Sequence, residues 1–341
     1  MAPTNKAAVL PQASAHPLVI QESEYPTVGK GEIIIKVAAI AINPMDWMIQ
    51  TLGDGLFSWL SYPFIGGTDV AGTVAEIGPD VTDFSVGDRV LGLGIGFVAR
   101  EGAFQEYVAV HTNLASRIPD SLSFADASVL PLGLTTAAGA LYEPGNLELA
   151  YPSLDPKPTG KTLLVWAGAS SVGTNAIQLA VASGYEVITT ASPKNFDYVK
   201  SVGASQVFDY SSPTVVQDLI EAFKGKTSAG GLAIYPGFED KVFEVVLASE
   251  GAKVVIAAMP LAEDKVPAGI ERARGIFAGT IKDNEVGGII FNKFVPEALA
   301  AGKFRALPPP VVVGEGLESL QEAVDKLKGG AASAKKLVVT L

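Results

Sequence analysis

The sequence contains no cysteine, and only two histidines, His16 and His111, among its 341 residues. The absence of cysteine excludes disulfides, thiolate nucleophiles and cysteine-based zinc sites. A metal would need carboxylate ligands, which suit hard cations such as magnesium. A serine–histidine–aspartate triad stays open, but neither histidine stands near a nucleophile-elbow pattern.

Long apolar runs and an excess of positive charge are also missing. No run approaches the roughly 18 residues of a membrane helix, and residues 1–6 lack the sections of a signal peptide. The formal net charge is −11, and an acidic surface repels phosphate backbones. We therefore expect a soluble, cytoplasmic protein with neither nucleic acid nor a membrane as a partner.

The length and composition favour two domains. The chain is 48% hydrophobic and contains 36 glycines and 22 prolines, which allows sizeable cores and many tight turns. Up to about residue 130, β-rich runs at 31–40, 69–77 and 89–92 are separated by turn signals. Short strands at this spacing predict a small barrel-like domain.

From about residue 131 the pattern changes to alternating strands and helices. This alternation predicts βαβ units, a parallel sheet and right-handed crossovers. The last run, 337–341, is a further strand that we expect to return to the first domain. The other predicted strands are 162–166, 186–190, 207–208, 232–235 and 253–257, and the predicted helices are 134–142, 172–183, 195–202, 215–223, 241–248, 294–301 and 317–327.

The strongest local signal is the segment 168–173 (GASSVG), which joins an apolar strand to a helix. In the dinucleotide fingerprint G-x-G-x-x-G, Gly168 and Gly173 take the first and third positions, and Ser170 takes the second. Such a loop, with Ser171 and Val172, lets backbone N–H groups reach a pyrophosphate at the helix N-terminus. We expect the Ser170 hydroxyl to bond a phosphate oxygen. The alternative is an ordinary strand–helix turn that needs glycine.

The end of the second alternating strand bears on the choice of cofactor. NAD enzymes carry Asp or Glu there, about 20 residues on, to bond the ribose 2′-hydroxyl. This strand runs instead into Ser192, Lys194 and Asn195. A hydroxyl and an ammonium suit a 2′-phosphate, so we expect NADPH. A helix cap at Ser192, with Pro193 next and a solvated lysine, also fits, and both interpretations can hold together.

These motifs resemble the medium-chain dehydrogenase/reductase superfamily over nearly the whole chain. The nearest groups are its zinc-free, quinone oxidoreductase-like branch and the fungal trans-acting enoyl reductases that partner polyketide synthases. The resemblance implies an α/β fold with two domains: a GroES-like β-barrel catalytic domain, 1–128 and 286–341, and a Rossmann domain with a doubly wound parallel sheet that binds NADPH, 129–285. The segments that carry it are 43–46 (NPMD), 66–72 (GGTDVAG), 87–90 (GDRV), 130–137 (LPLGLTTA), 192–195 (SPKN), 209–210 (DY) and 336–339 (KLVV).

The zinc-dependent alcohol dehydrogenases of this superfamily differ from this chain at the metal ligands. They place a cysteine near the position of Asn43, a His-Glu pair where Thr68 and Asp69 stand, and a four-cysteine lobe that has no counterpart here. Without a Lewis acid, alkoxide–ketone chemistry loses its main electrophile. Reduction of an enone stays open, because hydride attack on the β-carbon forms an enolate that hydrogen bonds can stabilise.

By resemblance, several side chains lie beside the cofactor. Thr136 is the candidate catalytic residue, since its hydroxyl would stabilise the enolate oxygen while solvent supplies the α-proton. The pair Thr135-Thr136 also fits a helix cap, and Tyr210 also fits a half-buried tyrosine at a strand end. A plain turn fits Asn43-Pro44 as well. The residues implied at the nicotinamide are Asn43, Pro44, Asp46, Thr136, Ala257 and Ala258, with Tyr210 at the 2′-phosphate.

Two further places bear on the substrate and cofactor. Many relatives carry a lysine or another polar residue where this chain has Met48, so any contact made by that residue is made differently here. Phe57, Trp59 and Tyr62 fit ordinary packing better than a pocket wall. We expect the segment before Lys335-Lys336 to close the phosphate side.

Together these features predict an NADPH-dependent, metal-free reductase. It would deliver hydride to the β-carbon of an enoyl thioester, enone or quinone, with a polyketide synthase as a further partner. A narrower version acts only on substrates carried by such a megasynthase. The alternative is an NADPH-binding interaction or structural protein without significant turnover, which an assay of NADPH oxidation distinguishes.

Overall fold

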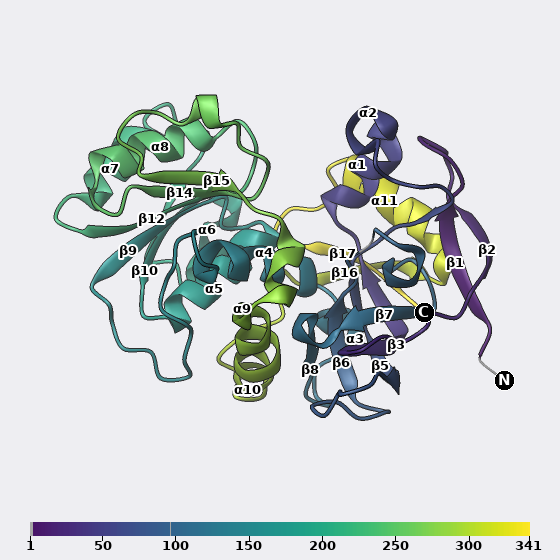
Figure 1. Cartoon of the computed structure of the whole chain (residues 1–341). Helices are drawn as coiled ribbons and strands as arrows, with labels where there is room; N and C mark the ends of the chain where they lie inside the picture. The colour runs from purple at the N-terminus through teal and green to yellow at the C-terminus, as the bar shows by residue number, and fades with distance from the viewer. Residues whose placement is uncertain (1–2, 96) are drawn as a thin grey trace. The chain divides into compact units, whose positions relative to one another are not determined.

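The computed structural model describes residues 3–95 and 97–341 and divides into two units. The first unit contains Met1–Leu132 and Gly287–Leu341, and the second contains Gly133–Val286 (Figure 1). Helix α4 (Pro131–Tyr142) begins in the first unit and continues in the second. The chain thus leaves the first unit once and returns to it for its last part.

The second unit is a doubly wound parallel sheet. Its strand order is β11-β10-β9-β12-β14-β15, in which the first strand along the chain lies beside the second and the fourth. This is the order of dinucleotide-binding folds, in which ligands lie at the carboxyl ends of the strands where the order reverses. The strands are β9 (Lys161–Trp166), β10 (Glu186–Ala191), β11 (Gln206–Asp209), β12 (Thr227–Ala233), β13 (Glu250–Gly251), β14 (Val254–Ala257) and β15 (Arg272–Gly275).

Helices cover both faces of this sheet. α5 and α6 lie on one face, and α7 and α8 lie on the other (Figure 1). The apolar pattern of the sequence predicts α7 well. Val215, Leu219 and Phe223 repeat at intervals of four, and all three are buried in one apolar core. The bounds of the helices are α5 (Ser171–Ala182), α6 (Phe196–Ser201), α7 (Val215–Phe223) and α8 (Glu239–Ala248).

One predicted strand of this unit was misplaced. The apolar run 232–235 predicts a strand there, but β12 spans Thr227–Ala233. Glycines in the strand hid its beginning, because glycine has low strand propensity. Gly231 is needed there, since a Cβ on it would lie 2.6 Å from Val242 Cγ1 of α8. Close packing of the helix on the sheet therefore outweighs the local preference.

The first unit contains a mixed sheet and a small antiparallel sheet. Their orders are β16-β17-β3-β5-β6-β8, with β7 paired to β3, and β2-β1-β4. β17 pairs antiparallel with β3, so the expected return of the terminal strand to the first unit is confirmed. The strands are β1 (Asn5–Leu10), β2 (Val19–Ser23), β3 (Glu32–Ala41), β4 (Phe64–Ile65), β5 (Asp69–Ile77), β6 (Arg89–Leu93), β7 (Tyr107–His111), β8 (Ala115–Arg117), β16 (Pro310–Glu315) and β17 (Lys336–Thr340).

Short helices fill the connections of the first unit. The predicted helix 294–301 corresponds to α10, which a π-helical segment precedes, and the predicted helix 317–327 is a 3-10 turn followed by α11. A helix that the sequence did not predict, α1, follows β3. The bounds are α1 (Pro44–Leu52), α2 (Asp54–Phe57), α3 (Phe124–Ala127), α9 (Glu285–Gly287), the π-helix Gly288–Phe294, α10 (Val295–Ala300) and α11 (Leu320–Lys328).

One helical stretch among the described residues, Phe124–Tyr142, is long and apolar enough to span a membrane by length and composition. Of its apolar window, 78% is buried inside the protein. Such burial is typical of a core helix, so the stretch is weak evidence for a membrane span.

Candidate functional site

The glycine turn after β9 has no room for side chains at its two glycines. A Cβ on Gly173 would lie 2.3 Å from the Ala167 carbonyl oxygen, and one on Gly168 would lie 2.3 Å from Thr189 Oγ1. Ala167 itself has a positive φ of 75°, an uncommon conformation outside glycine. The turn is therefore held in a tight form that brings the backbone close to the N-terminus of α5.

The start of α5 offers donors to an anion. The first N–H groups of any helix lack intrahelical partners, and the helix dipole favours negative charge there. Within the described residues, the buried Ser171 Oγ has no hydrogen-bond partner, so its hydroxyl can donate to a ligand. Unsatisfied buried polar atoms are rare and are expected to serve a ligand or water. The residues at this turn thus fit the pyrophosphate of a dinucleotide.

The Ser170 hydroxyl is engaged inside the turn. It donates to the Ala167 carbonyl oxygen at 2.8 Å and accepts from the Gly173 N–H at 3.0 Å, so Ser170 is the N-cap of α5. The predicted bond from this hydroxyl to phosphate would have to replace the bond to Ala167. Ser171, one residue further, has the unpaired hydroxyl instead.

A small polar group lies at the ends of β10 and β11. Ser192 Oγ is 3.5 Å from the Tyr210 hydroxyl, which brings together two residues that were predicted separately for the 2′-phosphate. Ser192 occupies a cap position with Pro193 next, but its side chain makes no cap hydrogen bond. The alternative of a Ser192 helix cap therefore holds for position and not for bonding. Lys194 is exposed in the same turn, and Asn195 is half-buried.

An aromatic group that the sequence did not predict extends from Tyr210. The Tyr210 ring is 6.3 Å from the Phe238 ring, and Phe238 stacks on Trp166 at 5.6 Å. The Lys241 ammonium lies 5.6 Å from the Phe238 ring centre and 5.7 Å from that of Trp166. Trp166 ends β9, so a cation and aromatic faces stand at the carboxyl end of the sheet. The sign of this group in the sequence was the pair of aromatic residues Tyr235 and Phe238 at and just after the end of a predicted strand.

The remaining predicted residues of the second unit lie on α4 and β14. Thr136 is buried. It lies in the second turn of α4, since this helix begins at Pro131. The alternative of a helix cap at Thr135-Thr136 is therefore wrong. Ala257 ends β14, and the Ala258 N–H donates to the Ala233 carbonyl oxygen at 2.8 Å. Ala257 and Ala258 thus stand at the carboxyl edge of the sheet.

In the first unit, Asn43, Pro44 and Asp46 form the start of α1. Asn43 is the N-cap, Pro44 is the first helical residue, and the Asp46 carboxylate accepts the Asn43 N–H at 2.7 Å. The alternative of a plain turn is therefore wrong. Pro44 suits this place because its fixed φ fits the first helical turn and its missing N–H needs no partner there.

The Asn43 side chain belongs to a buried cluster, which we call the Lys336 cluster: Asn43, Thr68, Asp69 and Lys336. Lys336 Nζ donates to Asn43 Oδ1 and lies 3.0 Å from Asp69 Oδ2. Asn43 Nδ2 donates to Thr68 Oγ1 at 3.0 Å. Asp69 Oδ1 accepts the N–H of Leu132 at 2.7 Å, and the Asp69 side chain is fully buried. The sequence predicted Asn43 as a site residue, but it gave Lys336 no role of its own.

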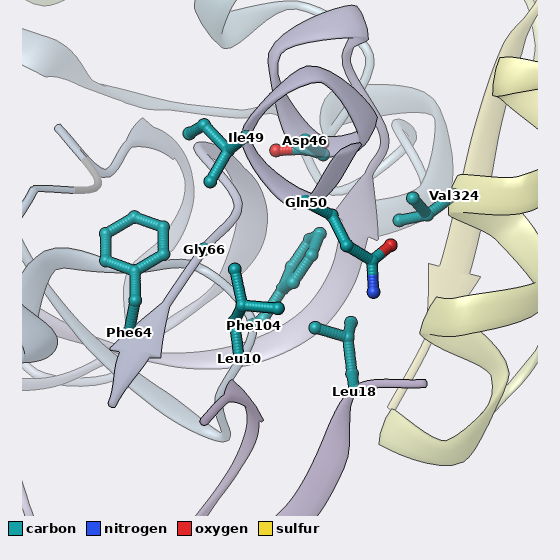
Figure 2. Close-up of a pocket in the computed structure, with 9 residues that line it drawn as sticks. All are labelled: Leu10, Leu18, Asp46, Ile49, Gln50, Phe64, Gly66, Phe104 and Val324. Atoms are coloured by element: carbon teal, nitrogen blue, oxygen red, sulfur yellow. The ribbon is translucent and has the colours of Figure 1, made fainter. Parts of the chain in front are cut away.

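Asp46 lies against an apolar cavity of about 20 Å³, roughly the space of one water molecule. Figure 2 shows Asp46, Ile49 and Gln50 of α1 around it, together with Leu10 and Phe104. Burial in these surroundings raises the pKa of Asp46 to about 7, and the Asp69 carboxylate acts in the same direction. The Asn43 N–H and the Lys336 ammonium oppose the rise. Asp46 is thus a buried carboxyl group that titrates near neutral pH.

The aromatic stretch at 52–62 divides between packing and exposure. Phe57 is buried in an apolar core, with Tyr62 and Met48 packed against that core. Trp59 is 57% exposed, and its ring lies 4.7 Å from that of Phe97. The expected packing role is confirmed for Phe57 and Tyr62, whereas Trp59 presents much of its surface to solvent.

Comparisons with known proteins agree with this architecture. Residues 29–120 match the family Alcohol dehydrogenase GroES-like domain. The dehydrogenase azaJ of Aspergillus niger is 50% identical over 99% of this chain and 99% of its own length. This chain belongs to the medium-chain dehydrogenase/reductase superfamily. Its fold is the α/β fold of that superfamily, a GroES-like domain with a Rossmann-type domain.

Two further comparisons concern the class of reaction. The trans-enoyl reductase himH of Aspergillus japonicus is 42% identical over 99% of this chain and 97% of its own length. The quinone oxidoreductase of Coxiella burnetii is 26% identical, with a TM-score of 0.75 over 99% of this chain and 100% of that structure. The chain is therefore an oxidoreductase of a superfamily that binds a nicotinamide cofactor, and it is similar to enoyl reductases and quinone oxidoreductases.

The Lys336 cluster bears on whether a zinc ion fits the positions where zinc-dependent members of the superfamily bind one. By resemblance, Asn43, Thr68 and Asp69 stand where zinc-dependent members of the superfamily have ligands, and here they surround an ammonium group. Among the described residues, no group of three or more histidine, aspartate or glutamate side chains could hold a metal ion. The donor set is thus built around a lysine cation, and a zinc ion does not fit it.

Proposed function

We propose that this chain is an NADPH-dependent, metal-free reductase that acts on enoyl thioesters, enones or quinones. The observation that carries the proposal is the glycine turn after β9, which closes so tightly on α5 that neither Gly168 nor Gly173 has space for a Cβ. A turn of this form at a helix N-terminus suits a dinucleotide pyrophosphate. We place Gly168, Ser170, Ser171, Val172 and Gly173 at that pyrophosphate.

The preference for NADPH rests on the ends of β10 and β11. Ser192 and Tyr210 stand 3.5 Å apart, and Lys194 adds an exposed cation in the same turn. We assign these three, with Asn195, to the 2′-phosphate, because a phosphate dianion is bound by cations and hydroxyl groups. The sequence of this turn carries no carboxylate that would repel the phosphate.

We assign the reaction to the first-unit residues Asn43, Pro44 and Asp46 and to Thr136, Ala257 and Ala258 at the nicotinamide. NADPH, when bound, supplies a hydride to the β-carbon. The electrons of the double bond move to the carbonyl oxygen, and the α-carbon then takes a proton from solvent. The Thr136 hydroxyl stabilises the oxygen that becomes negative, which is the charge an oxidoreductase of this type must balance.

The cofactor preference is tested by titration. We expect NADPH to bind at least tenfold more tightly than NADH, a difference of about 1.4 kcal/mol. Lys194→Ala should weaken NADPH and leave NADH unchanged, and Lys200→Ala, an exposed lysine of α6, is the matched control. Equal dissociation constants for the two cofactors would defeat the assignment.

The reaction is tested with a panel of acceptors. We expect NADPH oxidation with enones, enoyl thioesters or quinones and none with simple ketones. Robust ketone reduction by protein treated with a chelator would contradict the proposal. Tight NADPH binding without oxidation of any acceptor would favour the alternative of an interaction protein.

We further propose a polyketide synthase as the partner that carries the substrate. The name of the himH relative, trans-enoyl reductase, supports this. Activity with an enoyl chain on an acyl carrier domain, and much lower activity with the same chain on a short thiol, is the expected result. Equal kcat/KM values for both would contradict it.

A further inference from the structure

A groove of about 760 Å³ opens on a solvent-facing side of the first unit, and none of the residues placed at the cofactor lines it. Its floor is formed by β5, β3 and β7, because β3 pairs with β5 on one side and with β7 on the other (Figure 1). One wall is the segment 25–28, which lies between β2 and β3. A hollow of this size falls within the range of ligand sites, about 300 to 1,000 Å³. The aromatic and charged residues of the lining are Tyr25, Lys36, Glu76 and Tyr107.

The wall of this groove is held in place at both ends. The Asn5 side chain is 2% exposed, donates to the Glu24 carbonyl oxygen at 2.8 Å and accepts the Tyr107 N–H at 3.2 Å. At the other end, the Arg100 guanidinium donates to the Thr27 carbonyl oxygen at 3.4 Å. That guanidinium is fixed in turn by bonds of 2.6 and 2.8 Å to a carboxylate at the start of β3. The groove is therefore preformed, which lowers the cost of ordering a site on binding.

Two tyrosine rings form an aromatic surface inside the groove. The rings of Tyr25 and Tyr107 lie 5.0 Å apart at an angle of 57°. Burial raises the pKa of Tyr25, and the Glu76 carboxylate and Tyr107 act in the same direction, so its hydroxyl stays protonated and can donate. Grooves lined by aromatic residues bind proline-rich segments, because the polyproline II helix is rigid before it binds.

Two opposite charges stand on the floor of the groove. Lys36 and Glu76 are exposed, and neither forms an ion pair in the part of the chain that the structure describes. Lys36 lies opposite Thr73 of β5. Glu76 lies opposite Ile34, which is two residues from Lys36 and therefore on the same face of β3. With a rise of about 3.3 Å per residue and a strand spacing of about 4.8 Å, the Cα atoms of the two charged residues are about 8 Å apart.

We propose that this groove binds a polyproline II segment of a partner protein that carries an acidic and a basic residue three positions apart. The acidic residue pairs with Lys36, the basic residue pairs with Glu76, and a proline between them packs on the tyrosine rings. In this helix, residues three apart lie on the same edge at a distance of about 9 Å, which matches the spacing of the two charges on the floor. The inference goes beyond the proposed function and does not depend on it.

The first test is a titration with synthetic peptides at low ionic strength, measured by fluorescence anisotropy. The peptides are acetylated, amidated polyproline chains with one aspartate and one lysine placed one, two, three or four positions apart. We expect saturable binding that is tightest at a spacing of three, by about fivefold over a spacing of one. No saturable binding of any peptide up to about 1 mM, or equal binding at all spacings, would overturn the inference.

Charge reversal tests which residues hold the segment. Lys36→Glu should weaken the aspartate–lysine peptide by about fivefold and should prefer a peptide with two lysines at the same spacing. Glu76→Lys should prefer a peptide with two aspartates, and salt should reduce each preference. Lys30→Met is the matched control, because Lys30 is an exposed lysine that pairs with Asp80 outside the groove. If Lys36→Glu bound the aspartate–lysine peptide as tightly as the wild type, the inference would be wrong.

The aromatic surface is tested at Tyr107. Tyr107→Ser should weaken the peptide by about tenfold, whereas Tyr107→Phe keeps the ring and should stay within about twofold of the wild type. Denaturant unfolding shows whether Tyr107→Ser is folded, and the charge variants test the inference without it. Equal binding by a folded Tyr107→Ser would contradict it.

Other occupants of the groove give different results. Self-association of the wild type that Lys36→Glu abolishes would make the groove an interface between copies of this chain and would overturn the inference. NADPH binding and oxidation by Lys36→Glu should match the wild type, since the groove contains none of the residues placed at the cofactor. Failure of the proposed function is thus a separate result, in which the wild type oxidises no NADPH with any acceptor.

Discussion

The glycine turn after β9 and the Lys336 cluster depend on opposite physical means. The turn depends on atoms that are missing, since a Cβ on Gly173 would lie 2.3 Å from a carbonyl oxygen. The cluster depends on charges that are present, since Lys336 and Asp69 are buried against each other at 3.0 Å. The comparison teaches that one site tolerates no added atom and the other tolerates no removed charge.

The largest effect is expected from removing one charge of the cluster. Lys336→Met should lower the free energy of unfolding by about 3–5 kcal/mol, because it leaves the Asp69 carboxylate buried without a counter-charge. Denaturant unfolding measures the change. Lys335→Met, at an exposed position, should change stability by less than about 0.5 kcal/mol.

The pair of substitutions Lys336→Met and Asp69→Asn should recover much of the lost stability, because no charge is then buried alone. If the single variant and the paired variant were both as stable as the wild type, the claim that the cluster tolerates no removed charge would be wrong.

The next effect is expected from adding one methyl group to the turn. Gly173→Ala should cost about 1–3 kcal/mol of stability, as overpacking does, and should weaken NADPH binding by more than tenfold. Gly139→Ala is the control within α4, where a Cβ would meet Ile281 at an ordinary 3.5 Å. That substitution should be neutral or stabilise by up to about 1 kcal/mol. If Gly173→Ala bound NADPH as tightly as the wild type, the turn would not be part of the cofactor site.

A third prediction concerns pH. The pKa of Asp46 is raised from 3.8 to about 7, so between these values the folded protein keeps a proton that the unfolded chain has lost. Stability therefore falls as the pH rises from about 4 to 7, by at most about 1.4 kcal/mol per pH unit from this group. Below and above that window Asp46 contributes no slope.

Asp46→Asn keeps an oxygen that can accept the Asn43 N–H but does not titrate. We expect its stability to fall less steeply than that of the wild type across this window, as measured by unfolding at a series of pH values. Identical slopes for the two proteins would show that Asp46 is ionised throughout.

The smallest effect separates the two serines of the turn. Ser170→Ala removes the N-cap of α5 and should cost about 1 kcal/mol, while NADPH affinity changes less than threefold. Ser171→Ala removes a buried hydroxyl without a partner among the described residues, so it should leave stability unchanged and weaken NADPH. The reverse pattern would place the Ser170 hydroxyl on the phosphate, as the fingerprint alone suggests.

The second unit was largely predictable, and the reason is local. β9, α5, β10 and α7 follow from apolar periodicity, and their predicted bounds agree with the structure within two residues. β12 was misplaced because it contains glycines, which have low strand propensity, and Gly231 is there for the close packing of α8. Within the site, the glycine turn could be recognised because its motif is contiguous.

The first unit was less predictable. α1 was missed because the segment 43–46 also fits a turn, and its helical state depends on the Asp46 carboxylate that caps it. Contacts between distant residues were missed in the second unit as well. There the sequence predicted Ser192 and Tyr210 separately, without their contact, and it did not predict the stacking of Phe238 on Trp166.

By itself, the sequence determined the alternation of strands and helices, the glycine turn and the absence of an acid after β10, because each is a property of neighbouring residues. Only the tertiary structure decided that Lys336 meets Asp69 and Asn43. The pairing of β17 and β5 with β3 creates that contact, and a lysine at the start of an apolar strand carries no local sign of the carboxylate that neutralises it.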